Sequence, residues 1–169
     1  WVVAQNWQPQ VLIGINPAWL PLPGLAGLLF PPAAKLLAMT PFVPAWFARQ
    51  AASKGMVEAL LQSTGSSIDA RGTALYAHLV ASPSHAKGAL KMMAAWDLSG
   101  GRQTLRALRC PVRMLIGGQD STVPPGLAAT ALPLLRDGQL ETWAECGHLV
   151  HEEMPEATLR CLNRHLLLE

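Results

Sequence analysis

Two apolar runs in the C-terminal part of the chain each lead into a short turn that carries one ionisable side chain. The run 112–116 leads into Asp120, and the run 140–144 leads into His148. Residues 124–135 between them have the spacing of an amphipathic helix, which is the pattern of two parallel strands joined by a crossover helix. Because the chemistry of open parallel sheets gathers at the carboxyl ends of the strands, Asp120 and His148 are predicted to lie at one site.

A third strand is predicted near the start of the chain. Residues 11–16 form a compact apolar run between Pro9 and Pro17, as expected of a strand that is buried on both faces. After Pro17 the character changes to turns and helical patterns, without a further strand. The predicted fold is α/β with three parallel strands, arranged as a core strand with a preceding helix end over residues 1–16, a helical cap insertion over 17–101, and a C-terminal core over 102–169.

The helices are predicted from the signals at their ends. Ser66, with Asp69 three residues later, resembles a capping box and is predicted to start a helix. Acidic residues near the start and basic residues near the end favour a last helix through their interaction with the helix dipole. Besides the segment between the two strands, the other predicted helices cover residues 31–39, 43–50, 54–62, 84–96, 104–108 and 154–168.

The composition excludes several classes of protein. A hydrophobic share of 50% with only 14% charged residues argues against disorder. The basic residues are scattered and the net charge is +2, so no nucleic-acid partner is expected. Cys110, Cys146 and Cys161 form no CxxC pair, which predicts buried free thiols in a reducing, cytoplasmic compartment.

The first 34 residues contain no charged side chain, a pattern that could belong to a membrane protein. Six prolines nevertheless interrupt every window of spanning length, at positions 9, 17, 21, 23, 31 and 32. A transmembrane helix is therefore not expected, whereas peripheral contact of this apolar surface with a membrane remains open.

Several motifs give the chain a family resemblance. The order of a strand, a helical insertion, a strand ending in Gly-Gly-Gln-Asp, a helix and a strand ending in Gly-His is similar to the C-terminal half of an α/β-hydrolase. Within the first part of the chain, four segments resemble the magnesium-chelatase accessory hydrolases of bacteriochlorophyll biosynthesis, namely residues 14–18, 23–32, 65–72 and 92–98. The resemblance covers nearly the whole chain and implies a hydrolase core with a helical cap.

This resemblance implies a role for each of the two ionisable residues. Asp120 matches the acid and His148 the base of a Ser-His-Asp triad, in which the histidine takes the proton of the serine and the aspartate orients the imidazole. The two also occur in the order expected of the fold, acid before histidine. Taken singly, an aspartate that caps the following helix and a structural histidine are the alternatives.

The nucleophile of such a triad is not found in the sequence. No Gly-x-Ser-x-Gly motif occurs, and the serines stand at predicted caps and turns. The resemblance implies that the nucleophile strand and the oxyanion-hole loop precede Trp1, so this chain alone is expected to be inactive. It is also expected to expose the edge of its first strand, which predicts poor solubility or dimerisation. A degenerate, non-catalytic relative is the alternative.

Apolar residues of the insertion have a functional interpretation as the lining of a wide pocket, although most of them are expected to form core. The predicted pocket residues, which would suit a flat hydrophobic tetrapyrrole, are Trp19, Phe30, Trp46, Met92, Met93 and Trp96. Asp97 is either a turn residue or a contact to the substrate. His151 beside Glu152 lacks the further ligands of a metal site, so neither a metal nor another cofactor is predicted.

Three functions are consistent with these patterns. The first is a serine-type hydrolase that cleaves an ester or similar bond of a hydrophobic substrate once the nucleophile is supplied. The second is an accessory protein that holds a tetrapyrrole or assists magnesium chelatase without hydrolysis. The third is a generic cap-domain, esterase-like hydrolase of unrelated metabolism.

Overall fold

The computed structural model describes residues 9–24 and 55–166, together with positions 32, 33, 35–37, 39, 40, 42 and 49 between them. The chain divides into two compact units. The sheet unit comprises residues 1–21, 64–67 and 98–169, and the helical unit comprises residues 22–63 and 68–97. The helix end predicted within residues 1–8, the predicted helix at 43–50 except for position 49, and residues 167–169 lie outside the described residues.

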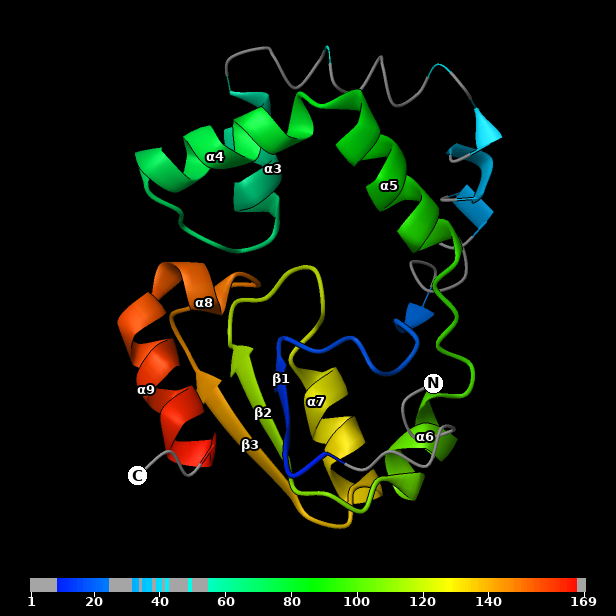
Figure 1. Ribbon diagram of the computed structural model, residues 1–169, viewed down its shortest axis with the longest axis vertical. Coiled ribbons are helices and arrows are strands. Elements are labelled where there is room, and N and C mark those ends of the chain that lie inside the picture. Colours follow the sequence, from blue (N-terminus) through cyan, green and yellow to red (C-terminus); the bar gives the residue numbers. More distant parts are fainter. Residues whose placement is uncertain are drawn as a thin grey trace. The chain divides into compact units, whose positions relative to one another are not determined.

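The sheet unit is built on three parallel strands in the order β1-β2-β3 (Figure 1). The strands are β1 (Leu12–Ile15), β2 (Val112–Gly117) and β3 (Gly138–Trp143). Pairing is in register from Leu12 with Val112 and from Val112 with Gly138. The three predicted strands are therefore confirmed. β1 lies at one edge of this sheet and β2, buried along most of its length, at the centre.

Alternation along β2 divides the core of the sheet unit between two faces. On one face Val112, Met114 and Ile116 pack against α6 (Gly101–Ala107), α7 (Gly126–Ala131) and the short 3₁₀ helix η2 (Leu132–Leu134). On the other face Leu115 packs with Val150 of α8 (Val150–Glu153) and Cys161 of α9 (Pro155–Leu166). Figure 1 shows α7 and α9 on opposite sides of the sheet. Each of these fully buried apolar side chains contributes about 1.5–3 kcal/mol.

Prolines mark two of the places where the helices of the sheet unit differ from the prediction. The helix predicted over residues 124–135 is α7 followed by η2, because Pro133 lacks the N–H that would continue the α-helical ladder. β3 then starts at Gly138. The predicted helix over residues 154–168 corresponds to α9, whereas α8, the short helix before it, was not predicted. The break between the two falls at Met154, before Pro155.

The helical unit contains α3 (Met56–Ser63), α4 (Ala70–Val80) and α5 (Pro83–Ala94), and α4 contacts both of the others. The described positions 32, 33, 35–37 and 39 are also helical. The prediction that Ser66 caps the start of a helix is wrong. The N-cap of α4 is Asp69, whose Oδ1 accepts a hydrogen bond of 2.6 Å from the Gly72 N–H.

Among the described residues, no helix is long and apolar enough to cross a membrane. The three cysteines are free and buried, as predicted.

Candidate functional site

Two loops meet at the carboxyl ends of the strands. The acid loop follows β2 and carries Asp120, and the histidine loop follows β3 and carries His148. The backbone N–H of Gly118 donates to the carbonyl of Trp143, and that of Gln119 to the carbonyl of Cys146, both at 2.9 Å. A Cβ on Gly117 would overlap the carbonyls of Cys146 and Gly147. The small residues that end β2 are thus required because the histidine loop crosses directly over them.

These two loops bring the predicted pair together. His148 Nδ1 lies 2.8 Å from Asp120 Oδ2. The Asp120 side chain is 1% exposed and that of His148 is 28% exposed, so the carboxylate is shielded while the imidazole reaches solvent. Oδ1 of Asp120 accepts hydrogen bonds of 2.8 Å from the N–H groups of Thr122 and Val123. Asp120 does not cap the following helix, because α7 starts at Gly126 with Pro125 as its N-cap and no side-chain cap bond. One carboxylate oxygen of Asp120 instead holds the loop backbone, and the other contacts the histidine.

Asn16 joins this pair and was missed in the sequence analysis. It follows β1 directly, is buried, and has a left-handed backbone with φ of 44°. Its Nδ2 donates to Asp120 Oδ2 at 2.5 Å and to the Gly147 carbonyl at 3.4 Å, whereas its Oδ1 has no partner among the described residues. A polar residue that closes an apolar strand at the carboxyl edge is the same signal that identified Asp120 and His148, and it could have identified Asn16.

Residues 64–67, which come between helices of the other unit in the sequence, belong to the sheet unit and brace both loops. The carbonyl of Thr64 accepts from the N–H of Ser121 at 3.2 Å and of His148 at 3.3 Å. The hydroxyl of Ser66, buried here, accepts from the Leu149 N–H at 2.8 Å. Ser66 thus contacts the histidine loop, while α4 starts only at Ala70 with Asp69 as its N-cap.

Glu153 completes the bracing from the other side. Its Oε1 accepts a hydrogen bond of 2.8 Å from the Gly147 N–H, and its Oε2 accepts one of 3.2 Å from the Ser67 N–H. A Cβ on Gly147 would overlap the backbone of Gly65 and Ser66. The histidine loop is thus held between β2, residues 64–67 and α8.

The electrostatics of the pair follow from these contacts. Burial would by itself raise the pKa of Asp120, but hydrogen bonds from His148, the Val123 N–H and Asn16 outweigh it and hold that pKa below its ordinary value. Asp120 is therefore ionised at neutral pH. Because an ionised carboxylate only accepts hydrogen bonds, the proton of a neutral His148 sits on Nδ1 and leaves Nε2 as the acceptor. Nε2 makes no hydrogen bond to any residue that the structure describes.

The predicted pocket residues are placed individually by the structure. Trp19 is partly buried and packs against the core of the sheet unit, with its ring against Gly14. Met92 and Trp96 are 66% and 46% exposed. Met93 is partly buried and Asp97 is exposed. Phe30 and Trp46 lie outside the described residues.

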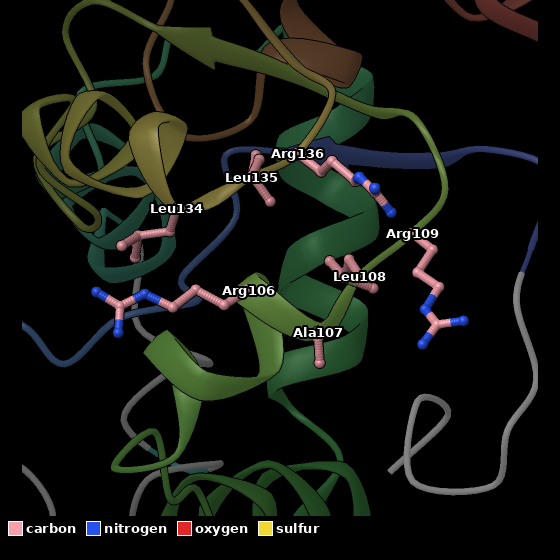
Figure 2. A pocket seen from close by; sticks show the side chains of 7 residues that line it. All are labelled: Arg106, Ala107, Leu108, Arg109, Leu134, Leu135 and Arg136. Carbon is pink, nitrogen blue, oxygen red and sulfur yellow. The ribbon is translucent and has the colours of Figure 1, made fainter.

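A separate cavity of about 490 Å³ lies on the sheet unit between the end of α6 and the turn that precedes β3. Its lining, drawn in Figure 2, consists of Arg106, Ala107, Leu108, Arg109, Leu134, Leu135 and Arg136. Figure 2 shows the guanidinium groups of Arg106 and Arg109 directed to opposite sides. The arginines do not converge on one point, and neither Asp120 nor His148 lines this cavity.

Comparison with known proteins decides the family. The family model described as "Alpha/beta hydrolase family" matches residues 2–160. This chain belongs to the alpha/beta hydrolase family. In this chain Asp120 and His148 follow the neighbouring parallel strands β2 and β3, at the carboxyl edge of the sheet, as expected from the sequence.

Individual relatives support the same assignment. The chain is 38% identical over 141 residues to the magnesium-chelatase 30 kDa subunit of Rhodobacter capsulatus, an alignment that covers 83% of this chain and 49% of that protein. Among solved structures, an alpha/beta hydrolase fold protein from Burkholderia ambifaria matches with a TM-score of 0.69 and 17% identity, over 95% of this chain and 58% of the other. A haloalkane dehalogenase loop variant from Bradyrhizobium elkanii matches with a TM-score of 0.66 and 18% identity, over 98% and 61%.

The alignments also show how much of these proteins the chain represents. It spans about half the length of the curated relative and somewhat more than half of the two solved structures. The likeness to the solved structures, at these identities, establishes the fold.

Proposed function

We propose that Asp120 and His148 are the acid and base of a serine-type hydrolase, and that the serine nucleophile is supplied by polypeptide outside residues 1–169. The observation that supports this proposal is the 2.8 Å contact between Asp120 Oδ2 and His148 Nδ1, between a shielded carboxylate and an imidazole open to solvent. An ionised, buried carboxylate on one ring nitrogen with the other nitrogen free is the arrangement that general-base catalysis by histidine needs.

In the proposed mechanism each residue of this chain has one task. His148 accepts the proton of the attacking serine hydroxyl at Nε2 and later returns it to the leaving group. Asp120 keeps the proton of the imidazole on Nδ1 and stabilises the imidazolium that forms. Asn16 donates to Asp120 Oδ2, the oxygen that His148 also contacts, and favours the ionised carboxylate. The oxyanion donors, like the nucleophile, come from outside the chain.

For the substrate we propose an ester of a hydrophobic molecule. Two observations favour an apolar substrate. Large apolar side chains are exposed on the helical unit, among them Leu75, Leu79, Met92 and Trp96. The relative from Rhodobacter capsulatus is named as a magnesium-chelatase subunit, so a tetrapyrrole of bacteriochlorophyll biosynthesis is the substrate class proposed for this chain.

A fluorophosphonate that labels activated serines tests the proposal. The reagent is applied to a protein in which these 169 residues are joined to a nucleophile-bearing N-terminal half. Labelling is expected, together with its loss by at least about 10³-fold in rate in His148→Ala. His151→Ala is the matched control, since His151 lies three residues away and is exposed, and its nearest acidic contact among the described residues is Glu152 at 3.8 Å. Absence of labelling, or equal loss in both variants, would refute the hydrolase proposal.

The name of the curated relative favours one second candidate, an accessory role in magnesium insertion without hydrolysis. In that role the pair would only stabilise the loops, and the partner would be a tetrapyrrole or magnesium chelatase itself. Pigment synthesis in a strain that carries Asp120→Ala with His148→Ala separates the two. Synthesis that continues at the normal rate favours the accessory role, and synthesis that stops while the protein remains folded favours hydrolysis. A protein that is labelled but has no effect on pigment would be an esterase-like hydrolase of other metabolism.

A further inference from the structure

A mixed cluster of potential metal ligands lies on the sheet unit at the side chains of Glu141, Cys161 and His165. Each offers one ligand atom, and these three atoms lie within 4.8 Å of one another. Glu141 comes from β3, and the other two come from α9, four residues apart and hence on one face of the helix. The same side chains line a cavity of about 220 Å³ together with Ile13 and Leu115.

We propose that this cluster, called the β3–α9 cluster below, is a zinc site that ties the last helix to the edge strand of the sheet. A thiolate, an imidazole and a carboxylate form the kind of mixed sulfur, nitrogen and oxygen set that zinc binds. Water from the adjoining cavity would fill the fourth position. The site shares no residue with the Asp120–His148 pair, so it can be tested separately from the proposed hydrolase function.

Two of the proposed ligands already lie at a suitable distance. The Cys161 thiol donates a hydrogen bond of 3.7 Å to Glu141 Oε2. In a tetrahedral zinc site, bond lengths of about 2.3 Å to sulfur and 2.1 Å to oxygen separate these atoms by about 3.6 Å. The imidazole of His165, in the last turn of α9 and partly buried, lies within 4.8 Å of both other ligand atoms, so a movement of at most about 1 Å brings it to the same distance. On binding, the Cys161 thiol releases its proton to solvent and the sulfur bonds to the metal.

The carboxylate is already oriented by neighbours that do not bind the metal. Trp143 Nε1 donates to Glu141 Oε1 at 2.8 Å, which leaves Oε2 directed toward Cys161. Such outer partners of a ligand commonly change metal affinity by about 10–100-fold. Arg164 opposes the ion, because its Nη2 lies 3.1 Å from Oε2 and must be displaced. Since 62% of the Arg164 side chain is exposed, it can turn into solvent at little cost.

Titration of the 169-residue chain with Co²⁺ tests the site, because a thiolate bound to cobalt gives a strong ligand-to-metal absorption band. We expect that band at one equivalent, its removal by added Zn²⁺, and its loss in Cys161→Ser. Cys110→Ser and Cys146→Ser are the controls, since both cysteines are buried and free but lie outside the β3–α9 cluster, and they should keep the band.

Substitutions around the site should change the affinity for Co²⁺ by different amounts. His165→Gln, in the last turn of α9, should weaken Co²⁺ binding by at least about tenfold, and Trp143→Phe by about tenfold. Arg164→Gln should tighten it. Circular dichroism of each variant shows whether it folds, and His165→Gln keeps the test valid if Cys161→Ser does not fold. A missing band in the folded chain, or a band that survives Cys161→Ser, would overturn the proposal.

Discussion

The two units of the chain differ in which side chains they bury and which they expose. At the carboxyl edge of the sheet unit, polar side chains are buried and joined by hydrogen bonds, with Asn16, Ser66 and Asp120 each at most 6% exposed. In the helical unit α4 has no buried residue and α5 has only Ala86, while Leu75 is 61% exposed and Met92 is 66% exposed. The first region is braced by polar contacts, and the second presents apolar surface.

This difference suggests separate roles for the two units. A buried polar network costs stability unless every group is paired, so one that links four separate stretches of chain is maintained for geometry rather than for packing. An exposed apolar helix surface costs little in stability and remains free to vary with the molecule it meets. We therefore expect substitutions at the carboxyl edge of the sheet to lower the free energy of unfolding strongly. Substitutions on the helices should change that free energy little and should instead change KM.

Replacing glycines in the two units should give the largest contrast. Gly147→Ala forces a methyl group into the backbone of residues 65 and 66 and should lower the free energy of unfolding by about 4 kcal/mol or more. Gly88→Ala in the middle of α5 meets no atom within 4 Å and should stabilise by about 0.5–1 kcal/mol. Urea unfolding followed by circular dichroism measures both. Equal effects would remove the distinction between the units.

Asn16 should show the next largest effect. Asn16→Ala removes the donor to Asp120 Oδ2 and places an alanine at a φ of 44°, so it should cost about 2–3 kcal/mol. Asn16→Gly removes the same donor but tolerates that backbone, so the difference between the variants measures the backbone contribution. Chemical denaturation gives both values. If Asn16→Ala were as stable as the parent chain, the network would not depend on Asn16.

The pH dependence of stability should come in part from Asp120. Its pKa is lower in the folded chain than in the unfolded chain, so its contribution is fully present above the unfolded value, about 3.9, and is lost as the pH falls through the folded value. Thermal unfolding between pH 6 and pH 2 should therefore show a steeper acid decline in the parent chain than in Asp120→Asn. Asp69, an exposed cap residue of α4, provides the control variant Asp69→Asn. Parallel declines in the parent and Asp120→Asn would contradict the assignment.

The helical unit should give the smallest changes in stability. Leu75→Ser and Met92→Ser replace exposed side chains and should shift the free energy of unfolding by no more than about 0.5 kcal/mol. If these side chains meet the substrate, each variant should nevertheless raise KM for an apolar ester in the protein joined to its nucleophile-bearing half. A large loss of stability would show that they are covered by apolar contacts.

How much the sequence could predict depended on whether the signal is local. The strands, and Asp120 and His148 at their ends, are marked by apolar runs and by small residues in sequence, and the structure brings that pair within hydrogen-bonding distance. Ser66 accepts a hydrogen bond from Leu149, and Glu153 accepts one from Ser67, each across more than 80 residues of sequence, which no local pattern reports. The capping signal at Ser66 failed for that reason, since its hydroxyl is used by Leu149.

The β3–α9 cluster was not predicted, because its side chains come together only in the folded chain. Cys161 and His165 have helical spacing, but the third ligand is Glu141, twenty residues earlier on a strand, so no compact ligand motif is present in the sequence. The metal-like pair that is visible in the sequence is His151 with Glu152, which lacks further ligands. Those two side chains are 47% and 33% exposed and lie 3.8 Å apart.

The central claim, that Asp120 and His148 act as one catalytic unit, is tested most directly by a double-mutant cycle on the rate of fluorophosphonate labelling. The four proteins are the parent, Asp120→Ala, His148→Ala and the double variant, each joined to the nucleophile-bearing half. Residues that act as a unit are strongly non-additive, so the double variant should be no slower than His148→Ala alone, within about threefold. Losses that multiply in the double variant, or a parent that is not labelled, would contradict the account.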